Sequence, residues 1–517
     1  MELIVSAGVI AAIVLWGIVA PRNLGDVFDT ALAAITRNFG WFYLWIVFGL
    51  VLLSVVLAVT RYGELKLGGE DEEPEFSAGA WFAMLFAAGM GIGLVFWGVA
   101  EPVSHYGTPP PGIAPGTPEA ANAGMLYSFF HWGLHPWAVY SIVALAIAFF
   151  QFRRGQSALA STAVRSLPWR PIAALGPLVN ILAIIATAFG VAASLGMGAL
   201  QINSGLRAVV GLPVGAASQV GIIVITTILF VVSAVTGVTR GIKWLSTFNL
   251  VLAALLALAV LLFGPTIAII DTFTTTLGSY LSDFIRLSLR MTPFRDSTWV
   301  GGWTIFYWAW WVSWAPFVGL FIARVSRGRT IREFILGTVA VPTLAGFLWF
   351  AVFGGTALNL EIMHDVPIAE AVKADVSTAL FALFDALPLS RILSTAATVL
   401  VLVFFVTSGD SATLVLAMMS TQGDENPPAR VKIIWGALVA GIAITLLLAG
   451  GLQAVQTATI VFALPFTLVI ILMAVALWRG VKEDWTEEMR RERAMRRRLR
   501  ELSGQVPAEI PRTPPTP

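Results

Sequence analysis

Tryptophan is concentrated in one apolar stretch of the chain, from Trp303 to Arg332. Within twelve residues of this stretch stand Trp303, Trp308, Trp310, Trp311 and Trp314. Each buried indole needs space and a partner for its N–H, so a dense group of indoles indicates the lining of a binding site. Indole faces attract cations, and a quaternary ammonium group suits such a surface best. The alternative is an aromatic belt at a membrane interface, which accounts for Trp303 better than for the rest.

A second unusual stretch carries glycine at three alternate positions, Gly89, Gly91 and Gly93. Glycine costs about 1 kcal/mol in a helix interior, so three together predict that a helix unwinds here. Unwound backbone inside a bilayer can offer amides to a carboxylate and carbonyls to a cation. Close helix packing of the Gly-x-x-x-G type is the competing interpretation. Ala100-Glu101-Pro102 predicts the end of this helix, and Ala315-Pro316 predicts an interruption of the tryptophan-rich one.

The overall composition indicates a membrane protein. Of 517 residues, 57% are hydrophobic and 12% are charged, whereas a soluble domain has about 25% charged residues. The net charge of +2 gives no reason to expect a nucleic-acid partner, and the absence of cysteine excludes disulfides and thiolate chemistry. His131 and His135 have the spacing of some metal ligands. No acidic or cysteine partner is near them in the sequence, so structural hydrogen bonding is the preferred interpretation.

Hydropathy predicts an all-α integral membrane protein with twelve transmembrane helices. A further segment, 269–297, is expected to be an amphipathic interfacial helix because Asp283, Arg286 and Arg290 lie among apolar residues at helical spacing. Lys and Arg follow the even-numbered segments, which predicts an inner-membrane protein with both termini cytoplasmic. The twelve segments are expected near 3–20, 41–60, 80–103, 120–151, 172–200, 216–238, 243–268, 299–323, 332–355, 391–420, 430–450 and 455–478.

Two interrupted helices, five segments apart, predict an inverted repeat. An odd spacing gives the two units opposite orientations, as in secondary transporters that bind substrate near the bilayer midplane. The polybasic end is expected to be a helix that senses anionic lipid, or else a solvated positive tail. The expected organisation is two leading helices with an acidic loop (1–79), a first five-helix repeat (80–268), the interfacial helix (269–297), a second repeat (298–478) and the basic cytoplasmic tail (479–517).

Three motifs give the chain a resemblance to the betaine/choline/carnitine transporter family, of glycine betaine type, over nearly its whole length. They are GMGIG followed by FWGVAEP (89–102), HWGLHPWAVY (131–140) and FYWAWWVSWAPFVGLFIARVSRGR (306–329). The resemblance implies a leucine-transporter-like five-plus-five inverted repeat behind two extra helices, and a homotrimer.

The resemblance also implies which residues bind substrate. An aromatic box would hold the onium group, with the unwound backbone beside it, and together they comprise Trp132, Trp137, Tyr140, Trp310, Trp311, Trp314, Gly89, Met90, Gly91 and Gly93. The helical offsets of 132, 137 and 140 place them broadly on one face, with Pro136 loosening the turn. Core packing is the alternative for Trp132 and Trp137. Some relatives carry aspartate at position 93, and glycine there leaves no counter-charge, which suits a zwitterion.

Sodium is the coupling ion that the resemblance implies, and no cofactor is implied. Its ligands would be the carbonyls of Ala87, Met90 and Phe404 and the hydroxyls of Thr407 and Ser408. The two hydroxyls could instead bond back to their own helix. A second sodium site would use Thr187 and Phe317, but the position four residues after Thr187 is Val191, which has no side-chain oxygen. The resemblance therefore favours one sodium per cycle, or else a weaker second site.

These observations predict sodium-coupled import of glycine betaine, or a related onium zwitterion, for osmoprotection. Proton-coupled choline uptake and carnitine-type exchange are the alternatives, and ectoine, proline or a dimethylsulfonio compound would suit the same box. A lipid-headgroup enzyme would need a nucleophile, base or metal cluster that the sequence does not offer, and a pure osmosensor would not need the box. Glu101 and Asp410 are intramembrane acids and so functional candidates, but we assign neither a proton role.

Overall fold

The computed structural model describes residues 1–89, 91–237, 239–294 and 298–504. Met90 lies outside this range, as do the ends of the segments predicted at 216–238, 269–297 and 479–517. In the described part the regular structure is helical, which confirms the all-α prediction there. The helices are α1 (Glu2–Val19), α2 (Pro21–Val59), α3 (Ala78–Gly89), α4 (Ile92–Gly107), α5 (Pro118–Trp132), α6 (Leu134–Ala148), α7 (Ala160–Arg165), α8 (Arg170–Ala173), α9 (Gly176–Val210), α10 (Ala216–Thr236), α11 (Thr239–Phe263), α12 (Thr266–Ser288), α13 (Phe306–Arg324), α14 (Ile331–His364), α15 (Ile368–Ala374), α16 (Ala379–Asp385), α17 (Ser390–Ser420) and α18 (Ala429–Gly504), with short turns of 3₁₀- or π-helix at Arg61–Glu64, Phe149–Arg153, Gly301–Ile305 and Val376–Thr378.

Ten helical segments of the described residues are long and apolar enough to cross a membrane. The segment predicted near 80–103 is not among them because it is split into α3 and α4, each shorter than a full span. The last two predicted segments lie together in α18, where only Gly450 and Gly451 have non-helical backbone. The protein is therefore a multi-pass membrane protein, and the count of twelve helices with an inverted repeat stays a prediction.

Three helix boundaries differ from the expected ones. Helix α2 begins at Pro21 and not near residue 41, because residues 21–40 carry charges that lower their hydropathy without preventing helix formation. The predictions of an end at Pro102 and of a break at Pro316 are wrong, since α4 and α13 continue through these prolines. Neighbouring helices in a membrane often accommodate a proline, and Pro102 packs closely against two glycines, Gly124 and Gly354.

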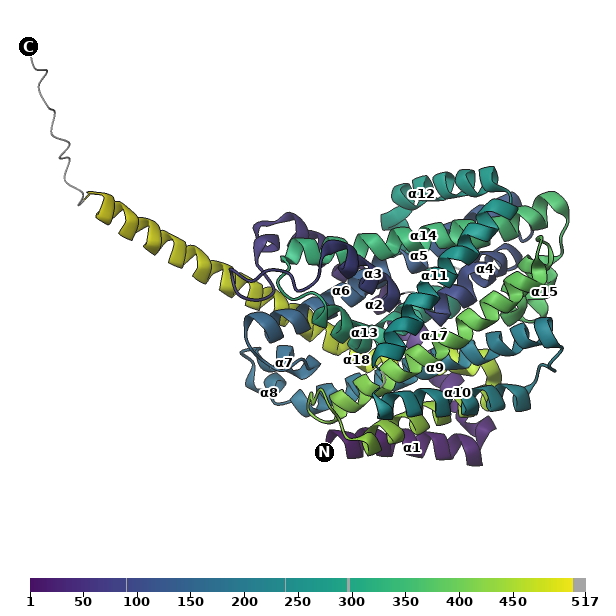
Figure 1. The fold of residues 1–517 in the computed structure, drawn as a ribbon, viewed down its shortest axis with the longest axis horizontal. Helices are drawn as coiled ribbons and strands as arrows, with labels where there is room; N and C mark the ends of the chain where they lie inside the picture. Colours follow the sequence, from purple (N-terminus) through teal and green to yellow (C-terminus); the bar gives the residue numbers. More distant parts are fainter. Residues whose placement is uncertain (90, 238, 295–297, 505–517) are drawn as a thin grey trace, which may run out of the picture.

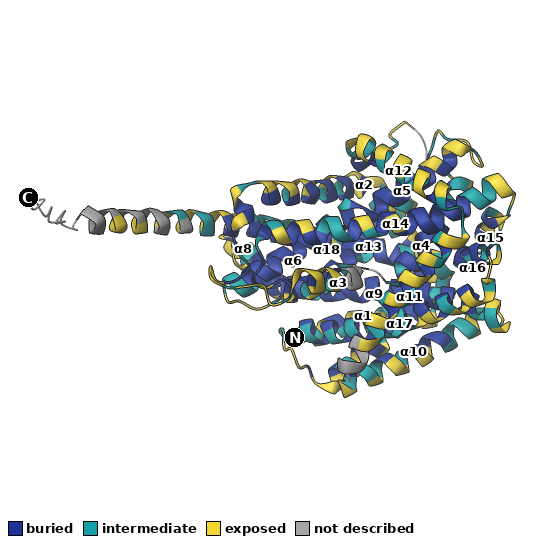
Figure 2. Cartoon of the chain, turned by 45° about the horizontal axis from the view of Figure 1, so that its top comes forward, coloured by how far each residue is buried: buried dark blue, intermediate teal, exposed yellow. Residues whose placement is uncertain are grey.

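Burial is greatest in the helices at the centre of the bundle (Figure 2). In the most apolar part of Pro118–Arg153, which includes α5 and α6, 94% of the residues are buried, compared with 22% for the corresponding part of α1. Helix α12 lies at the edge of the bundle in Figures 1 and 2, and it is not one of the ten candidate spans. In the most apolar part of Gly301–Arg324, which includes the tryptophan-rich helix α13, 83% of the residues are buried, so α13 is an interior helix, as a lining role requires.

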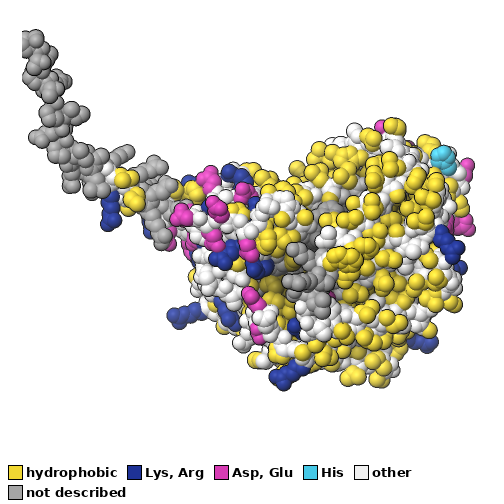
Figure 3. Space-filling view, in the orientation of Figure 1, with side chains coloured by type: hydrophobic (Ala, Val, Ile, Leu, Met, Phe, Trp, Pro, Cys, Tyr) yellow, Lys and Arg dark blue, Asp and Glu magenta, His cyan; other side chains and the backbone are white. Residues whose placement is uncertain are grey.

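Charged side chains gather at the end of the body from which the tail helix leaves (Figure 3). Here the loop after α2 pairs with the chain between α13 and α14: Leu67 N donates to Arg329 O at 2.8 Å, and Arg324 forms an ion pair with Glu75 at 2.9 Å. We call this end the arginine face and define it by Arg153, Arg154, Arg324, Arg327 and Arg329.

The start of the tail also joins the arginine face. Arg153 contacts both Glu70 and Asp484 at 2.9 Å, and Arg154 contacts Asp484 at 2.7 Å. The loops that follow α2, the α5–α6 segment and α13 thus lie on one side of the bundle, together with the base of the tail. This arrangement agrees with the even-numbered loops sharing one side, as the distribution of arginine predicts.

Candidate functional site

A cavity of about 700 Å³ lies inside the bundle. It reaches the surface at the exposed residues Gln156, Arg324 and Glu425, so it opens beside the arginine face. From the predicted site residues its lining includes Gly91, Gly93, Trp132, Tyr140, Trp310, Trp311, Trp314, Phe317, Phe404, Thr407 and Ser408. One space thus collects residues predicted for both substrate and sodium.

Five of the aromatic residues predicted for substrate binding, from α5, α6 and α13, line this cavity. The ring of Trp132 lies edge-on to Trp311, with centroids 4.8 Å apart, and Tyr140 lies edge-on to the same ring at 5.8 Å. Trp310 stacks on Trp311 at 5.1 Å, and Trp314, the least buried of the five, completes the group. We call these five residues the aromatic box. Their arrangement offers several π surfaces to one ligand, as binding of an onium group requires.

Trp137 does not line the cavity. It is buried against Tyr140, with ring centroids 5.6 Å apart. Non-helical backbone at Gly133 (φ −88°, ψ −138°) separates Trp132 at the end of α5 from Trp137 and Tyr140 in α6. Helical offsets counted across this break do not describe which residues share a face. Contact between Trp137 and substrate therefore stays a prediction, and its observed contact supports the ring of Tyr140.

The glycine-rich stretch interrupts the helix as predicted. Helix α3 ends at Gly89, and α4 begins at Ile92 after Gly91, whose backbone is extended (φ −138°, ψ −163°). Gly93 is also a steric requirement, because a Cβ at this position would lie 2.4 Å from the Trp310 ring and 3.2 Å from the Trp132 ring. The absence of a side chain at Gly93 lets the two indoles approach α4. Met90 lies outside the described residues, and the Ala87 side chain is likewise not described.

The predicted sodium ligands of α17 face the cavity. Phe404, Thr407 and Ser408 all line it. Thr407 Oγ1 donates its hydroxyl proton to the carbonyl of Val403 at 2.9 Å. The predicted alternative, a bond from this hydroxyl back to its own helix, is therefore present. A hydroxyl that donates in this way keeps lone pairs for a cation. These hard oxygen donors therefore fit a sodium ion, and the other two of the five proposed ligands come from Ala87 and Met90.

The residues of the doubtful second sodium site are only partly brought together. The hydroxyl of Thr187 is fully buried and has no hydrogen-bond partner among the described residues, and Phe317 lines the cavity. Val191 is buried and contributes no oxygen. The donor set for a second ion is thus incomplete at the position that the sequence indicated.

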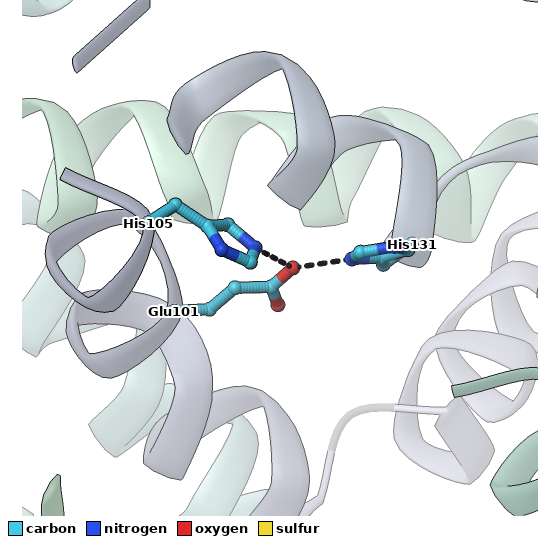
Figure 4. Close-up of side chains that lie close together, drawn as sticks. All are labelled: Glu101, His105 and His131. Carbon is cyan, nitrogen blue, oxygen red and sulfur yellow. Dashed lines mark hydrogen bonds and ion pairs between the residues drawn. The ribbon is translucent and has the colours of Figure 1, made fainter. Parts of the chain in front are cut away.

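A buried cluster next to the aromatic box was missed by the sequence reasoning. Glu101 of α4 has no exposed surface, and its Oε1 lies 2.7 Å from Nδ1 of His131 and 3.3 Å from Nε2 of His105 (Figure 4). Its Oε2 accepts the indole N–H of Trp132 at 2.8 Å and the hydroxyl of Tyr307 at 2.5 Å. The expectation that no acidic residue partners His131 is therefore wrong. The spacing of Glu101 and His105 was visible in the sequence, but the contact with His131 joins positions 30 residues apart.

This cluster is held by hydrogen bonds. The ligand atoms of Glu101, His105 and His131 lie within 4.8 Å of one another, close enough to share a metal ion. Each Glu101 oxygen, however, already has two partners. His135 does not join His131, because its Nε2 lies 2.8 Å from Ser288 Oγ and its ring stacks on Trp308. His131 and His135 both make the kind of buried hydrogen bond that was expected of them, while the absence of a metal ion stays a prediction.

Comparison with known proteins agrees with these features. The sequence profile described as betaine/carnitine/choline family transporter matches residues 2–486. The chain is 46% identical to the glycine betaine transporter of Bacillus subtilis (strain 168), over 93% of this chain and 94% of the relative. It is also 46% identical to an ectoine/hydroxyectoine transporter of Virgibacillus pantothenticus, over 92% and 95% of the two chains. A probable glycine betaine transporter of Desulfitobacterium hafniense (strain Y51) is 42% identical over 93% and 97%.

Proposed function

The chain belongs to the betaine/carnitine/choline transporter family, and from this premise we propose that it imports glycine betaine, or a related onium zwitterion, by sodium symport. Membership makes it a membrane-embedded transporter of betaine type and not an enzyme. The proposal further includes a role in osmoprotection, a twelve-helix inverted-repeat architecture, a homotrimer, and an inner-membrane location with both termini cytoplasmic.

The observation that carries the proposal is the aromatic box beside the helix break in one cavity. A trimethylammonium group cannot donate hydrogen bonds, so indole faces compensate for its lost water, with each close contact contributing up to about 2 kcal/mol. The carboxylate at the other end of a zwitterion needs donors. The indole N–H of Trp310 is buried without a partner among the described residues, and the extended backbone at Gly91 lies on the same cavity. These groups suit the two ends of a small zwitterion.

Sodium coupling is proposed from the oxygen donors of α17. Phe404, Thr407 and Ser408 would hold the ion together with the carbonyls of Ala87 and Met90 at the helix break. Bound there, sodium would supply positive charge that ties α3 to α17 across the cavity. A single ion per cycle is proposed because Val191 offers no ligand for a second one.

The two ends of the cavity region differ, as alternating access requires. The cavity opens beside the arginine face. On the side of the aromatic box away from this opening, aromatic side chains are packed together. The rings of His105 and Trp303 have centroids 4.3 Å apart, and those of Tyr127 and Trp299 have centroids 4.7 Å apart. If the arginine face is cytoplasmic, this conformation is the one that releases substrate into the cell.

Uptake of labelled glycine betaine into proteoliposomes tests the proposal. We expect accumulation with an inward sodium gradient and none with a proton gradient alone. Trp311→Leu should abolish accumulation, because it removes the ring that contacts both Trp132 and Tyr140. Trp45→Leu is the matched control, since Trp45 is 56% exposed on α2 and does not line the cavity.

Each alternative has its own outcome in this assay. Accumulation driven by protons alone would contradict sodium symport and favour the choline-type carrier. Uptake only in exchange for preloaded substrate would favour a carnitine-type exchanger. Stronger competition by ectoine than by unlabelled glycine betaine would indicate that this protein carries ectoine, as the name of its 46%-identical ectoine/hydroxyectoine relative states for that protein.

A further inference from the structure

We propose that Glu101 supplies the negative charge that makes the aromatic box prefer a cationic headgroup, and that it also holds the Trp132 and Tyr307 rings in place. Glu101 does not line the cavity, so it is a positioning and specificity-determining residue and not a ligand of the substrate. The inference rests on the proposed function, because it assigns a role within the same binding site.

The contacts of Glu101 are those of an ionised carboxylate. Both oxygens are acceptors, each with two neighbours, and the indole N–H of Trp132 can only donate. The Tyr307 hydroxyl lies 2.5 Å from Oε2, which is the separation typical of a hydroxyl donating to a charged oxygen. A proton on the carboxyl group would take up one of these acceptor positions. The arrangement therefore favours a fixed negative charge inside the bundle.

Neutral forms of the two neighbouring histidines account for their contacts with Glu101. His131 can donate from Nδ1 to Glu101 while Nε2, which lies 3.0 Å from Thr304 Oγ1, accepts the threonine hydroxyl. A neutral His131 ring is thus satisfied on both sides. His105 Nδ1 is buried and has no hydrogen-bond partner among the described residues, so a protonated ring would leave an unpaired N–H, which is unfavourable. The ion pairs of the described residues join no arginine or lysine to Glu101.

Trp132 connects this charge to the cavity. Its indole N–H donates to Glu101, while its ring lines the cavity and lies edge-on to Trp311. Donation to an anion increases the electron density of the indole, and buried surroundings screen the charge weakly. A cation against the Trp132 face is therefore attracted more strongly than by an indole alone. Because Glu101 stays behind the ring, it attracts the onium group without forming a salt bridge that would hinder its release.

Tyr307 receives its position from the same carboxylate. Its ring stacks on Trp311 with centroids 6.2 Å apart and lies 5.8 Å from that of Trp132. The indole N–H of Trp311 in turn donates to the carbonyl of His131 at 3.0 Å. One buried acid thus fixes rings on α5 and α13, the two helices that supply most of the aromatic box.

The test compares glycine betaine with tert-butylacetate, in which a neutral carbon replaces the quaternary nitrogen. Both dissociation constants are measured on the purified full-length protein by competition with labelled glycine betaine. Glu101→Gln keeps the size of the side chain and removes its charge. We expect it to lower the preference for glycine betaine over tert-butylacetate by about tenfold, equivalent to ~1.4 kcal/mol. Tyr307→Phe is the comparison variant, since it removes a positioning hydrogen bond but keeps the charge and the ring. We expect it to weaken the binding of both ligands alike and to leave the preference near that of the wild type.

Equal weakening of both ligands by E101Q would overturn the proposal, because it would indicate a purely structural role. So would a loss of preference in Y307F as large as that in E101Q. A dissociation constant reports only binding-competent molecules, so partial misfolding does not mimic the result. If E101Q binds neither ligand, Trp132→Phe decides: it keeps a ring but removes the link to Glu101, and an unchanged preference would refute the inference. Failure of the wild-type protein to bind glycine betaine would instead contradict the proposed function.

Discussion

At the scale of single residues, Gly93 has a role that its sequence context suggests only in part. Lack of charge at this position was expected to suit a zwitterion. The structure adds that any side chain would collide with Trp310 and crowd Trp132. An aspartate here would therefore change both the charge and the shape of the aromatic box.

Gly93→Ala tests the steric part of this interpretation. A Cβ 2.4 Å from the Trp310 ring forces the indole to move, and such overpacking typically costs about 1–3 kcal/mol. We expect glycine betaine to bind roughly tenfold more weakly or worse, measured as its dissociation constant. Gly221→Ala is the control, because Gly221 of α10 has no atom within 4 Å of an added Cβ. Wild-type affinity in G93A would show that Trp310 is free to move.

The site residues differ in how far the sequence could predict them. The aromatic residues stand out by type, and the structure brings Trp132, Tyr140 and three tryptophans of α13 to one cavity. Glu101 and His131 could not be paired in advance, because their contact depends on how α4 packs against α5. Trp137 was implied by the family resemblance, and it is buried against Tyr140 and does not line the cavity.

At the scale of elements, helix α17 carries hydroxyl side chains in two settings. Some of them line the cavity, and another is exposed on the surface of the protein. Thr407 and Ser408 line the cavity. Thr395 of the same helix bonds back to the Arg391 carbonyl at 2.7 Å and is exposed. The helix thus provides both a test position and a control of matched chemistry for the proposed sodium site.

Ser408→Ala should raise the sodium concentration for half-maximal uptake by about tenfold, since it removes a single oxygen ligand worth ~1–2 kcal/mol. Thr395→Ala should leave it unchanged. The measurement is the sodium dependence of initial uptake rates at saturating glycine betaine. An unaltered sodium dependence in S408A would remove this residue from the ion site.

Hydropathy predicted the long apolar helices well, and its errors have physical causes. The first half of α2 is helical but carries Arg22, Asp26 and Arg37, and a hydropathy average cannot distinguish a charged helix from a loop. Local rules predict breaks at Pro102 and Pro316, yet each proline removes only one backbone donor, and neighbouring helices keep both segments regular. Local rules thus found the elements but not the packing that overrides them.

At the scale of the whole molecule, ion pairs connect the base of the tail to loops of the arginine face. Single exposed pairs contribute little, about 0–1 kcal/mol, and Arg324 and Glu75 are 58% and 39% exposed. Arg153 and Arg154 are less exposed and share Asp484. Partial burial opposes the charge on Arg154, but hydrogen bonds to Asp484 and Glu483 outweigh it and raise the pKa of this guanidinium. Ion pairs therefore anchor the base of the tail, and added salt weakens the attraction between their charges.

Deleting all residues after Trp485 should abolish activation by hyperosmotic stress while basal uptake survives. The deletion keeps Asp484 and its partners but removes the charged helix proposed to sense anionic lipid. Uptake into proteoliposomes is measured at increasing external osmolality. Removal of residues 505–517 alone is the control and should preserve activation. Normal activation in the longer deletion would eliminate the tail as a sensor.

The continuity of α18 gives the tail a mechanical property. No loop separates the last apolar segment from the charged helix that projects from the body (Figure 1). At 1.5 Å per residue, the part beyond Trp485 is a rod about 30 Å long. A tilt of roughly 10° at its base would therefore displace its tip by ~5 Å, as a lever amplifies a small rotation. Any rocking of the last membrane helix during transport would thus move the tip of the tail. In the same way, a force on the tip would be transmitted to this helix and would alter the transport cycle.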